Sequence, residues 1–152
     1  SGLGHWFLQK GGLLQVRAQR SARCDATGMH YVRIFNDEAG ESHFEDVSLP
    51  EVVVPPEQGV AELTLSDSVP VDRAIFVSLP GDEQAPDWHT APRRQFVVVL
   101  DGGVRIEVSD GEVRDLPAGS VVLVEDTTGR GHVTEYVPGP RRVILIPLEA
   151  DE

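Results

Sequence analysis

Two β-hairpins are predicted by the stretch FVVVLDGGVRIEVSDGEVRDL, residues 96–116. The segments 96–100, 104–108 and 112–116 are short and rich in β-branched residues, as strands are. Between them lie Asp101-Gly102-Gly103 and Asp110-Gly111. These residues favour tight reversals, because glycine accepts a positive φ and aspartate bonds its own backbone. We therefore expect three strands, each paired with the next.

The same pattern continues on both sides of this stretch. Further strands are predicted at 29–35, 42–49, 60–65, 73–79, 120–124, 132–137 and 141–148, with proline- and glycine-rich turns between them. Beyond residue 28, no segment sustains an apolar period of 3.6 residues over three turns. Many short strands separated by turns predict an all-β domain, built as a sandwich, a jelly roll or a barrel.

Length and charge limit the partners of this domain. With 152 residues, 40% of them hydrophobic, the chain suits one packed domain. Its net charge of −12 would repel phosphate backbones and anionic membranes, so neither nucleic acid nor a membrane is an expected partner. Cys24 is the only cysteine, so no internal disulfide can form, and we expect a cytoplasmic protein.

Residues 1–28 differ in charge from the rest of the chain. They contain four basic residues and one acidic residue, whereas the remainder is strongly acidic. Met29, the only methionine, is the first residue of the first predicted strand. We therefore expect residues 29–152 to form the domain and residues 1–28 to be a peripheral upstream extension or an expression remnant. The alternative is a native helix over residues 13–20.

Two motifs in this order resemble those of the cupin superfamily. In the first cupin motif, two histidines separated by one residue are followed by an acidic or amide residue and then by a glycine. His89, Gln95 and Gly102 match three of these positions, and Ala91 stands in place of the second histidine. In the second motif, Pro117-Ala118-Gly119 matches a PxG turn. His132 matches the remaining histidine, after a loop that is about two residues longer than usual.

This resemblance implies a cupin fold for residues 29–152, that is, a double-stranded β-helix closed as a jelly-roll barrel. It implies little about the reaction, because one fold hosts many chemistries. The chain looks most like the small single-domain bacterial cupins.

The resemblance also implies a site inside the barrel. Strand alternation would place His89, Ala91, Arg93 and Gln95 on one face, with His132 entering from a neighbouring strand. The catalytic candidates are His89, His132 and Gln95. The candidates for ligand binding are Trp88, Arg93, Val97, Val99 and Val122. Polar groups in an apolar concavity are typical of small-molecule sites.

A metal is not the expected cofactor. Cupins that bind Fe, Mn, Ni or Zn generally use three histidines and a carboxylate, whereas this sequence has lost one histidine and carries an amide at the acidic position. If a divalent metal is bound, His89, Gln95 and His132 would be its ligands. Without one, the histidines are candidates for general acid and base, and Gln95 could orient a substrate carbonyl or hydroxyl.

Three functions remain open at this point: a metal-independent isomerase, cyclase or lyase, a mononuclear metal-dependent oxygenase, and a non-catalytic module that binds or senses a small ligand. The plainer alternatives are that the histidines are structural, that Trp88 only packs, and that residues 125–129 form a solvated loop and no lid. A homodimer is expected from the fold, because a jelly roll leaves open strand edges, with residues 29–47 as the segment that exchanges or pairs.

Overall fold

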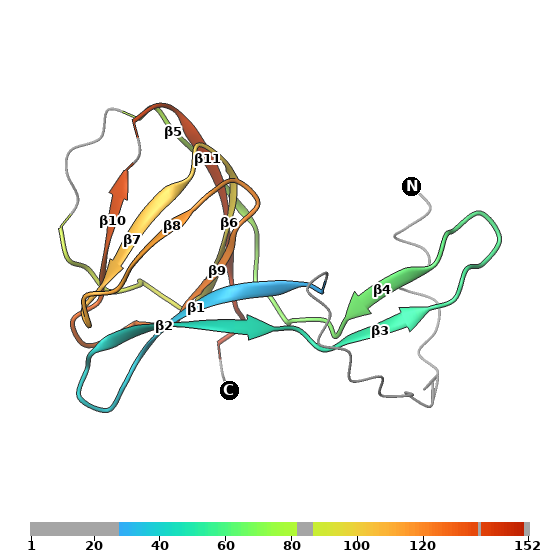
Figure 1. The fold of residues 1–152 in the computed structure, drawn as a ribbon, viewed down its shortest axis with the longest axis horizontal. Helices are drawn as coiled ribbons and strands as arrows, with labels where there is room; N and C mark the ends of the chain where they lie inside the picture. The colour runs from blue at the N-terminus through green and yellow to red at the C-terminus, as the bar shows by residue number, and fades with distance from the viewer. Residues whose placement is uncertain (1–27, 82–86, 137, 151–152) are drawn as a thin grey trace.

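The structure is a computed structural model that describes residues 28–81, 87–136 and 138–150 (Figure 1). In these residues the chain forms strands and no helix, so the predicted all-β class is confirmed. The strands are β1 (His30–Asn36), β2 (Ser42–Ser48), β3 (Glu51–Val54), β4 (Leu63–Ser66), β5 (Ile75–Leu79), β6 (Gln95–Asp101), β7 (Val104–Val108), β8 (Val113–Leu116), β9 (Val121–Val124), β10 (His132–Tyr136) and β11 (Arg141–Pro147). The predictions for residues 1–27, including Cys24, lie outside the described residues.

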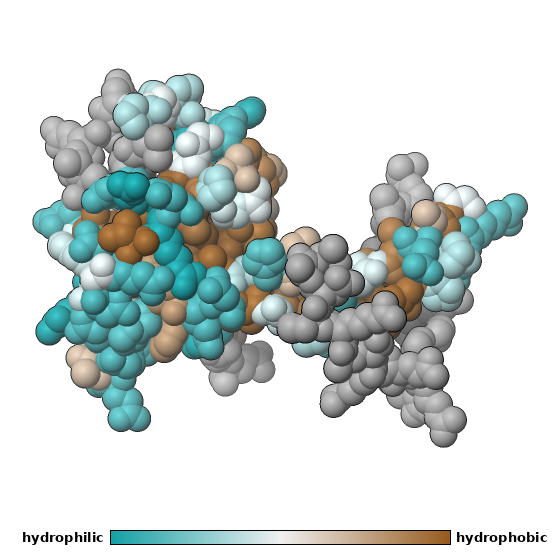
Figure 2. Space-filling model, viewed as in Figure 1, coloured by the Kyte–Doolittle hydropathy of each residue, from teal (hydrophilic) through white to brown (hydrophobic). Residues whose placement is uncertain are grey.

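The strands form three open sheets. A six-stranded sheet has the order β2-β1-β9-β6-β11-β5, and a three-stranded sheet has the order β10-β7-β8. The third sheet is the β3–β4 hairpin, which projects from the body of the molecule as an arm (Figures 1 and 2). Every pairing is antiparallel except that of β1 with β9. None of these sheets closes on itself.

The core lies between the two larger sheets. The six-stranded sheet contributes Ile34, Phe44, Val99, Val122 and Val124, and the three-stranded sheet contributes Val104, Ile106 and Val108. These side chains alternate with outward residues along each strand, as expected of a layer that is buried on one face. Burial of this apolar surface holds the two layers together.

The positions of the predicted strands agree with the structure, with the exception of β3. The chain around β3 contains Pro50, Pro55 and Pro56, which favoured a loop at this position. The hairpin predicted from residues 104–108 and 112–116 is also confirmed: β7 pairs with β8, and Val104 lies opposite Leu116.

The other predicted hairpin, of residues 96–100 with 104–108, is wrong. β6 pairs with β9 and β11, whereas β7 pairs with β8 and β10. Gly102 and Gly103, with φ values of 81° and 76°, carry the chain from one sheet to the other. A Cβ at Gly102 would lie 2.5 Å from the Cβ of Arg141, so a side chain does not fit there. The crossover lets β6 and β7 bury apolar residues from opposite sides of the core.

No helix in the described part of the chain is long and apolar enough to cross a lipid bilayer.

Candidate functional site

The two histidines of the predicted site are neighbours in the structure. His132 begins β10, and its side chain is only 7% exposed. Its backbone forms two hydrogen bonds with His89: His132 N donates to His89 O at 2.9 Å, and His89 N donates to His132 O at 3.0 Å. The centroids of the two imidazole rings are 4.6 Å apart, and the ring planes are tilted by 59°. His89 is exposed, so it lies on the solvent side of His132.

Asp126 contacts one of these histidines, His132. Its Oδ2 lies 2.6 Å from Nδ1 of His132, and the residue is fully buried. Asp126 follows β9 of the six-stranded sheet and His132 begins β10 of the three-stranded sheet, so the contact links the two layers. We refer to Asp126, His132 and His89 as the Asp–His–His cluster.

The Asp126 carboxylate is only half satisfied. Its Oδ1 is buried and has no hydrogen-bond partner among the described residues. Burying a polar group without a partner costs free energy, so such groups are uncommon in folded proteins. An unsatisfied buried carboxylate in contact with a histidine is therefore a candidate for function.

The partners of each ring determine which nitrogen carries a proton. A carboxylate only accepts, so His132 Nδ1 must donate to Asp126. His89 Nδ1 lies 2.9 Å from the carbonyl oxygen of Asp87, which also only accepts. In the neutral forms of both rings, Nε2 therefore carries the lone pair. The cluster presents two imidazoles whose Nε2 atoms can each accept a proton or bind a donor.

A glycine makes the close approach of His89 and His132 possible. Gly131 has a φ of 73°, and a Cβ there would lie 2.1 Å from the carbonyl oxygen of His89. Buried Ser42 fixes the same glycine, because its hydroxyl donates to Gly131 O at 2.6 Å and accepts from Ser109 N at 2.8 Å. The backbone at Gly131 is thus held between His89 and Ser42.

The residues of β6 that were expected to point inward are buried or partly buried, beginning with the first residue of the strand. Gln95 and Val99 are buried, and Val97 is partly buried against the core. Val122, opposite Val97 on β9, is buried as well. Val99 and Val122 belong to the packed core. Gln95 lies opposite Val124, two residues before Asp126, so the amide and the carboxylate stand at the same end of adjacent strands.

Trp88 and Arg93 are placed differently from the other candidates. The chain bends over residues 92–94 and β6 begins only at Gln95, so the expected alternation does not extend back to His89. Ala91 is buried, but Arg93 and Trp88 are exposed. Arg93 lines a shallow surface pocket with Asp72, Leu148 and Glu149, and no residue of the Asp–His–His cluster lines that pocket.

The donors in this region fit a divalent metal poorly. In the described residues, no three histidine, cysteine, aspartate or glutamate side chains are grouped so that they could share an ion. One nitrogen of His132 is already engaged by Asp126, and the buried amide of Gln95 is a weaker ligand than a carboxylate. We therefore assign no reaction step to a metal.

Sequence reasoning missed Asp126. The loop that contains it was predicted as solvated or as a lid, because it combines charges with turn residues. The structure contradicts the solvated alternative for Asp126, which is buried, and for Glu125, whose side chain is 16% exposed and pairs with Arg33 and Arg94; the following residues 127–130 are exposed. The available signal was the register of β9: Val122, Val124 and Asp126 are two residues apart and share the inward face.

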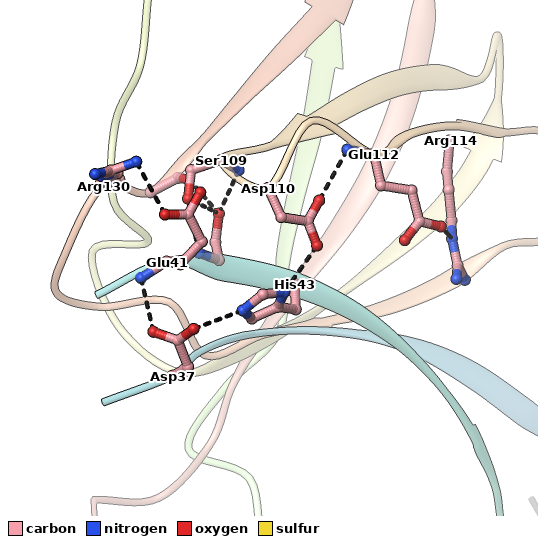
Figure 3. A network of polar contacts seen from close by, with 10 residues as sticks. Asp37, Glu41, His43, Ser109, Asp110, Glu112, Arg114 and Arg130 are labelled. Carbon is pink, nitrogen blue, oxygen red and sulfur yellow. Dashed lines mark hydrogen bonds and ion pairs between the residues drawn. The ribbon is translucent and has the colours of Figure 1, made fainter. Parts of the chain in front are cut away.

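A second polar network lies around His43 on β2 (Figure 3). His43 Nε2 is 2.8 Å from Asp37 Oδ2, and Nδ1 is 2.7 Å from Asp110 Oδ2. Because carboxylates only accept, both contacts are satisfied only by the imidazolium form. The hydrogen bonds from Asp37 and then Asp110 raise the pKa of His43 above its usual 6.5.

The same network lowers the pKa values of its carboxyl groups. The pKa of Asp37 is lowered mainly by its hydrogen bond to His43. The pKa of Asp110 is lowered mainly by the backbone N–H of Glu112, with His43 adding to the effect. Asp37 lies in the turn between β1 and β2, and Asp110 lies between β7 and β8, so we call the three residues the His43 clamp.

Comparison of the sequence with protein-family models finds no family that matches, and comparison with curated proteins finds no significant relative. The function is therefore argued from the geometry of the Asp–His–His cluster.

Proposed function

We propose that this protein is an enzyme that moves a proton on a small organic substrate, in an isomerase, cyclase or lyase reaction that needs no metal. The observation that carries the proposal is the 2.6 Å contact between the fully buried Asp126 carboxylate and His132 Nδ1. A carboxylate in this position fixes the tautomer and orientation of an imidazole and stabilises its protonated form.

The roles of the cluster follow from its exposure. His132 Nε2 is the candidate general base, because its lone pair is free when Nδ1 donates to Asp126. His89 lies on the solvent side of His132 and is placed to exchange a proton with substrate or water. Gln95, buried at the same end of β6, can both donate and accept, so it suits a carbonyl or hydroxyl of the substrate.

We also propose that the two larger sheets correspond to the cupin double-stranded β-helix. The order of the matching residues supports this: His89 and Gln95 precede and begin β6, and Gly102 follows it. The turn 117–119 precedes β9, and His132 begins β10. A cupin fold would make the cluster the counterpart of the site that the resemblance implies.

Solvent hydrogen exchange tests the proposal directly. The purified full chain is incubated in D2O with a panel of small carbonyl compounds, and loss of the α-proton signal is followed by NMR. We expect catalysed exchange of at least one compound class, reduced by about 10²–10⁴-fold in His132→Gln, the usual contribution of a general base. His30→Gln, which changes an exposed histidine at the start of β1, is the matched control.

The other two functions give different results. Near-stoichiometric metal in chain purified without a tag or chelator, lost in both His89→Ala and His132→Ala, would favour the metal-dependent enzyme. Saturable binding of a panel compound without exchange or conversion would favour a binding module. Exchange that is equal in wild type and His132→Gln would contradict the role of His132.

A further inference from the structure

The outward face of the six-stranded sheet is apolar where a solvated sheet face would be polar. Two rows of paired residues cross it. One row is Phe76–Ile144–Val98–Val121, and the other is Ile146–Phe96–Leu123. These residues alternate with the inward core residues of β5, β11, β6 and β9, so they lie on the opposite side of the sheet. Phe76 is 77% exposed, Leu123 is 5% exposed, and the other five residues are half-buried. We call this surface the outer apolar face.

The three-stranded sheet shows what a solvated face looks like in the same protein. Its outward positions include Arg105, Asp115, Glu107 and Glu135, and Arg105 pairs with Asp115 at 2.7 Å. Antiparallel sheets normally have one such polar face toward water. The outer apolar face departs from this rule over four adjacent strands, and patches of this kind mark interaction sites.

The β3–β4 arm carries a second apolar surface. Val52 lies opposite Leu65, and Val54 lies opposite Leu63, so these four side chains share one face of the hairpin. Val52 and Leu63 are 41% and 37% exposed. No third strand joins this hairpin among the described residues. An isolated two-stranded hairpin is marginally stable in water, so the arm needs a surface to pack on.

The two surfaces belong to the same chain but stand apart in it. The arm continues outward beyond the ends of β1 and β2, away from the body (Figure 1). Hydrophobic atoms run along the arm and reach the edge of the body on the side that faces the arm (Figure 2). β1 and β2, which contain most of the segment 29–47 expected to exchange or pair, belong to the six-stranded sheet with β2 at its edge, so the projecting arm is a different segment.

We infer that the partner of both surfaces is a second copy of this chain. In a two-fold dimer, the arm of each copy would lie on the outer apolar face of the other, which covers both surfaces with one symmetric contact. A second copy is a better candidate than an unrelated partner because one chain provides both the apolar arm and the outer apolar face. Neither half has a charge at its centre. Glu51 lies on the other face of the arm, and both rows are apolar from β9 to their other end, although the row of Leu123 continues on β1 and β2 with Arg33 and Glu45.

Sedimentation velocity of the full chain over a concentration series tests this inference. We expect a dimer for the wild type. Phe76→Asp on the sheet and Val52→Asp on the arm should each raise the dissociation constant by at least about 100-fold, as expected for central apolar contacts. Val113→Asp is the control, because Val113 is also an exposed valine but lies on the three-stranded sheet. All three positions are exposed, so the circular dichroism spectra should not change.

Mixing the two monomeric variants distinguishes reciprocal exchange from other dimers. A mixed dimer of Phe76→Asp with Val52→Asp has one doubly altered contact and one intact contact. We therefore expect partial recovery of dimer in the mixture and none in either variant alone. A wild-type chain that is monomeric at every concentration overturns the inference and leaves the face to a different partner. A Val52→Asp variant that remains fully dimeric overturns the role of the arm.

Discussion

At the scale of single residues, Gly131 decides whether the Asp–His–His cluster can assemble. Its φ is 73°, and a Cβ at this position would lie 2.1 Å from His89 O, which leaves no room for alanine. We expect Gly131→Ala to lower the free energy of unfolding by more than about 2 kcal/mol, because backbone strain and a backbone clash add. Urea denaturation measures the loss.

Gly111→Ala separates the two contributions. Gly111 has a φ of 94°, but a side chain there meets no atom within 4 Å. The control should therefore show only the cost of a left-handed backbone, about 1–2 kcal/mol. Equal losses in the two variants would mean that the contact with His89 adds nothing.

Asp126 controls the proton position on His132. In the wild type, long-range ¹⁵N–¹H NMR should show His132 with its proton on Nδ1, because the carboxylate only accepts. Asp126→Ala removes that acceptor, so we expect a mixture of tautomers and a rate of the exchange reaction lower by about 10²–10⁴-fold.

Glu125→Ala is the matched control for Asp126. Glu125 is the neighbouring carboxylate and pairs instead with Arg33 and Arg94, away from the histidines. The control should keep the wild-type spectrum of His132. A fixed Nδ1 tautomer that survives in Asp126→Ala would show that the carboxylate does not position the ring.

At the scale of elements, the His43 clamp ties the β1–β2 turn to the β7–β8 turn. Because folding raises the pKa of His43, its stabilising effect is present below the unfolded value of 6.5 and is lost as the pH rises through the folded value. Folding lowers the pKa values of Asp37 and Asp110, so their effect is present above 3.8 and is lost as the pH falls through their folded values. The clamp is therefore strongest in mildly acidic solution.

His43→Gln should reveal this window in thermal unfolding. We expect the variant to melt about 2–4 °C below the wild type in mildly acidic buffer, since exposed ion pairs are worth little. The difference should vanish in alkaline buffer of the same ionic strength. His30→Gln, at an exposed position outside the clamp, should show no such trend. A gap for His43→Gln that is independent of pH would assign the effect to packing.

The sequence predicts those features of the strands that depend on neighbouring residues, and not those that depend on distant parts of the chain. Strand positions such as 104–108 follow from alternation and turn residues, which act within a few residues. The partner of a strand does not: Gly102 and Gly103 allow a hairpin as well as a crossover, and the choice depends on burying Val99 and Val104 from opposite layers.

The same distinction between local and distant interactions applies to the residues of the candidate site. The motif positions of His89 and His132 made them candidates, and the structure places them side by side. Asp126 was missed because its burial depends on a contact with the other sheet, which turn composition does not reveal. Arg93 was assigned to the inward face by an alternation that the bend at 92–94 interrupts.

At the scale of the whole molecule, charge and apolar surface act against each other. Each copy carries a net charge of −12, so two copies repel while the arm and the outer apolar face attract. Salt screens the repulsion, with a Debye length of about 8 Å at physiological ionic strength, and leaves the apolar contact intact. We therefore expect the dimer to tighten as sodium chloride is raised, measured by sedimentation velocity at fixed protein concentration.

The direction of the salt effect identifies the force that holds the copies together. Val113→Asp adds a further negative charge without touching the proposed contact, so it should dimerise slightly less at low salt and like the wild type at high salt. If the dimer instead dissociates as salt is raised, ion pairs hold it, and the apolar arm and sheet face cannot be its main contact.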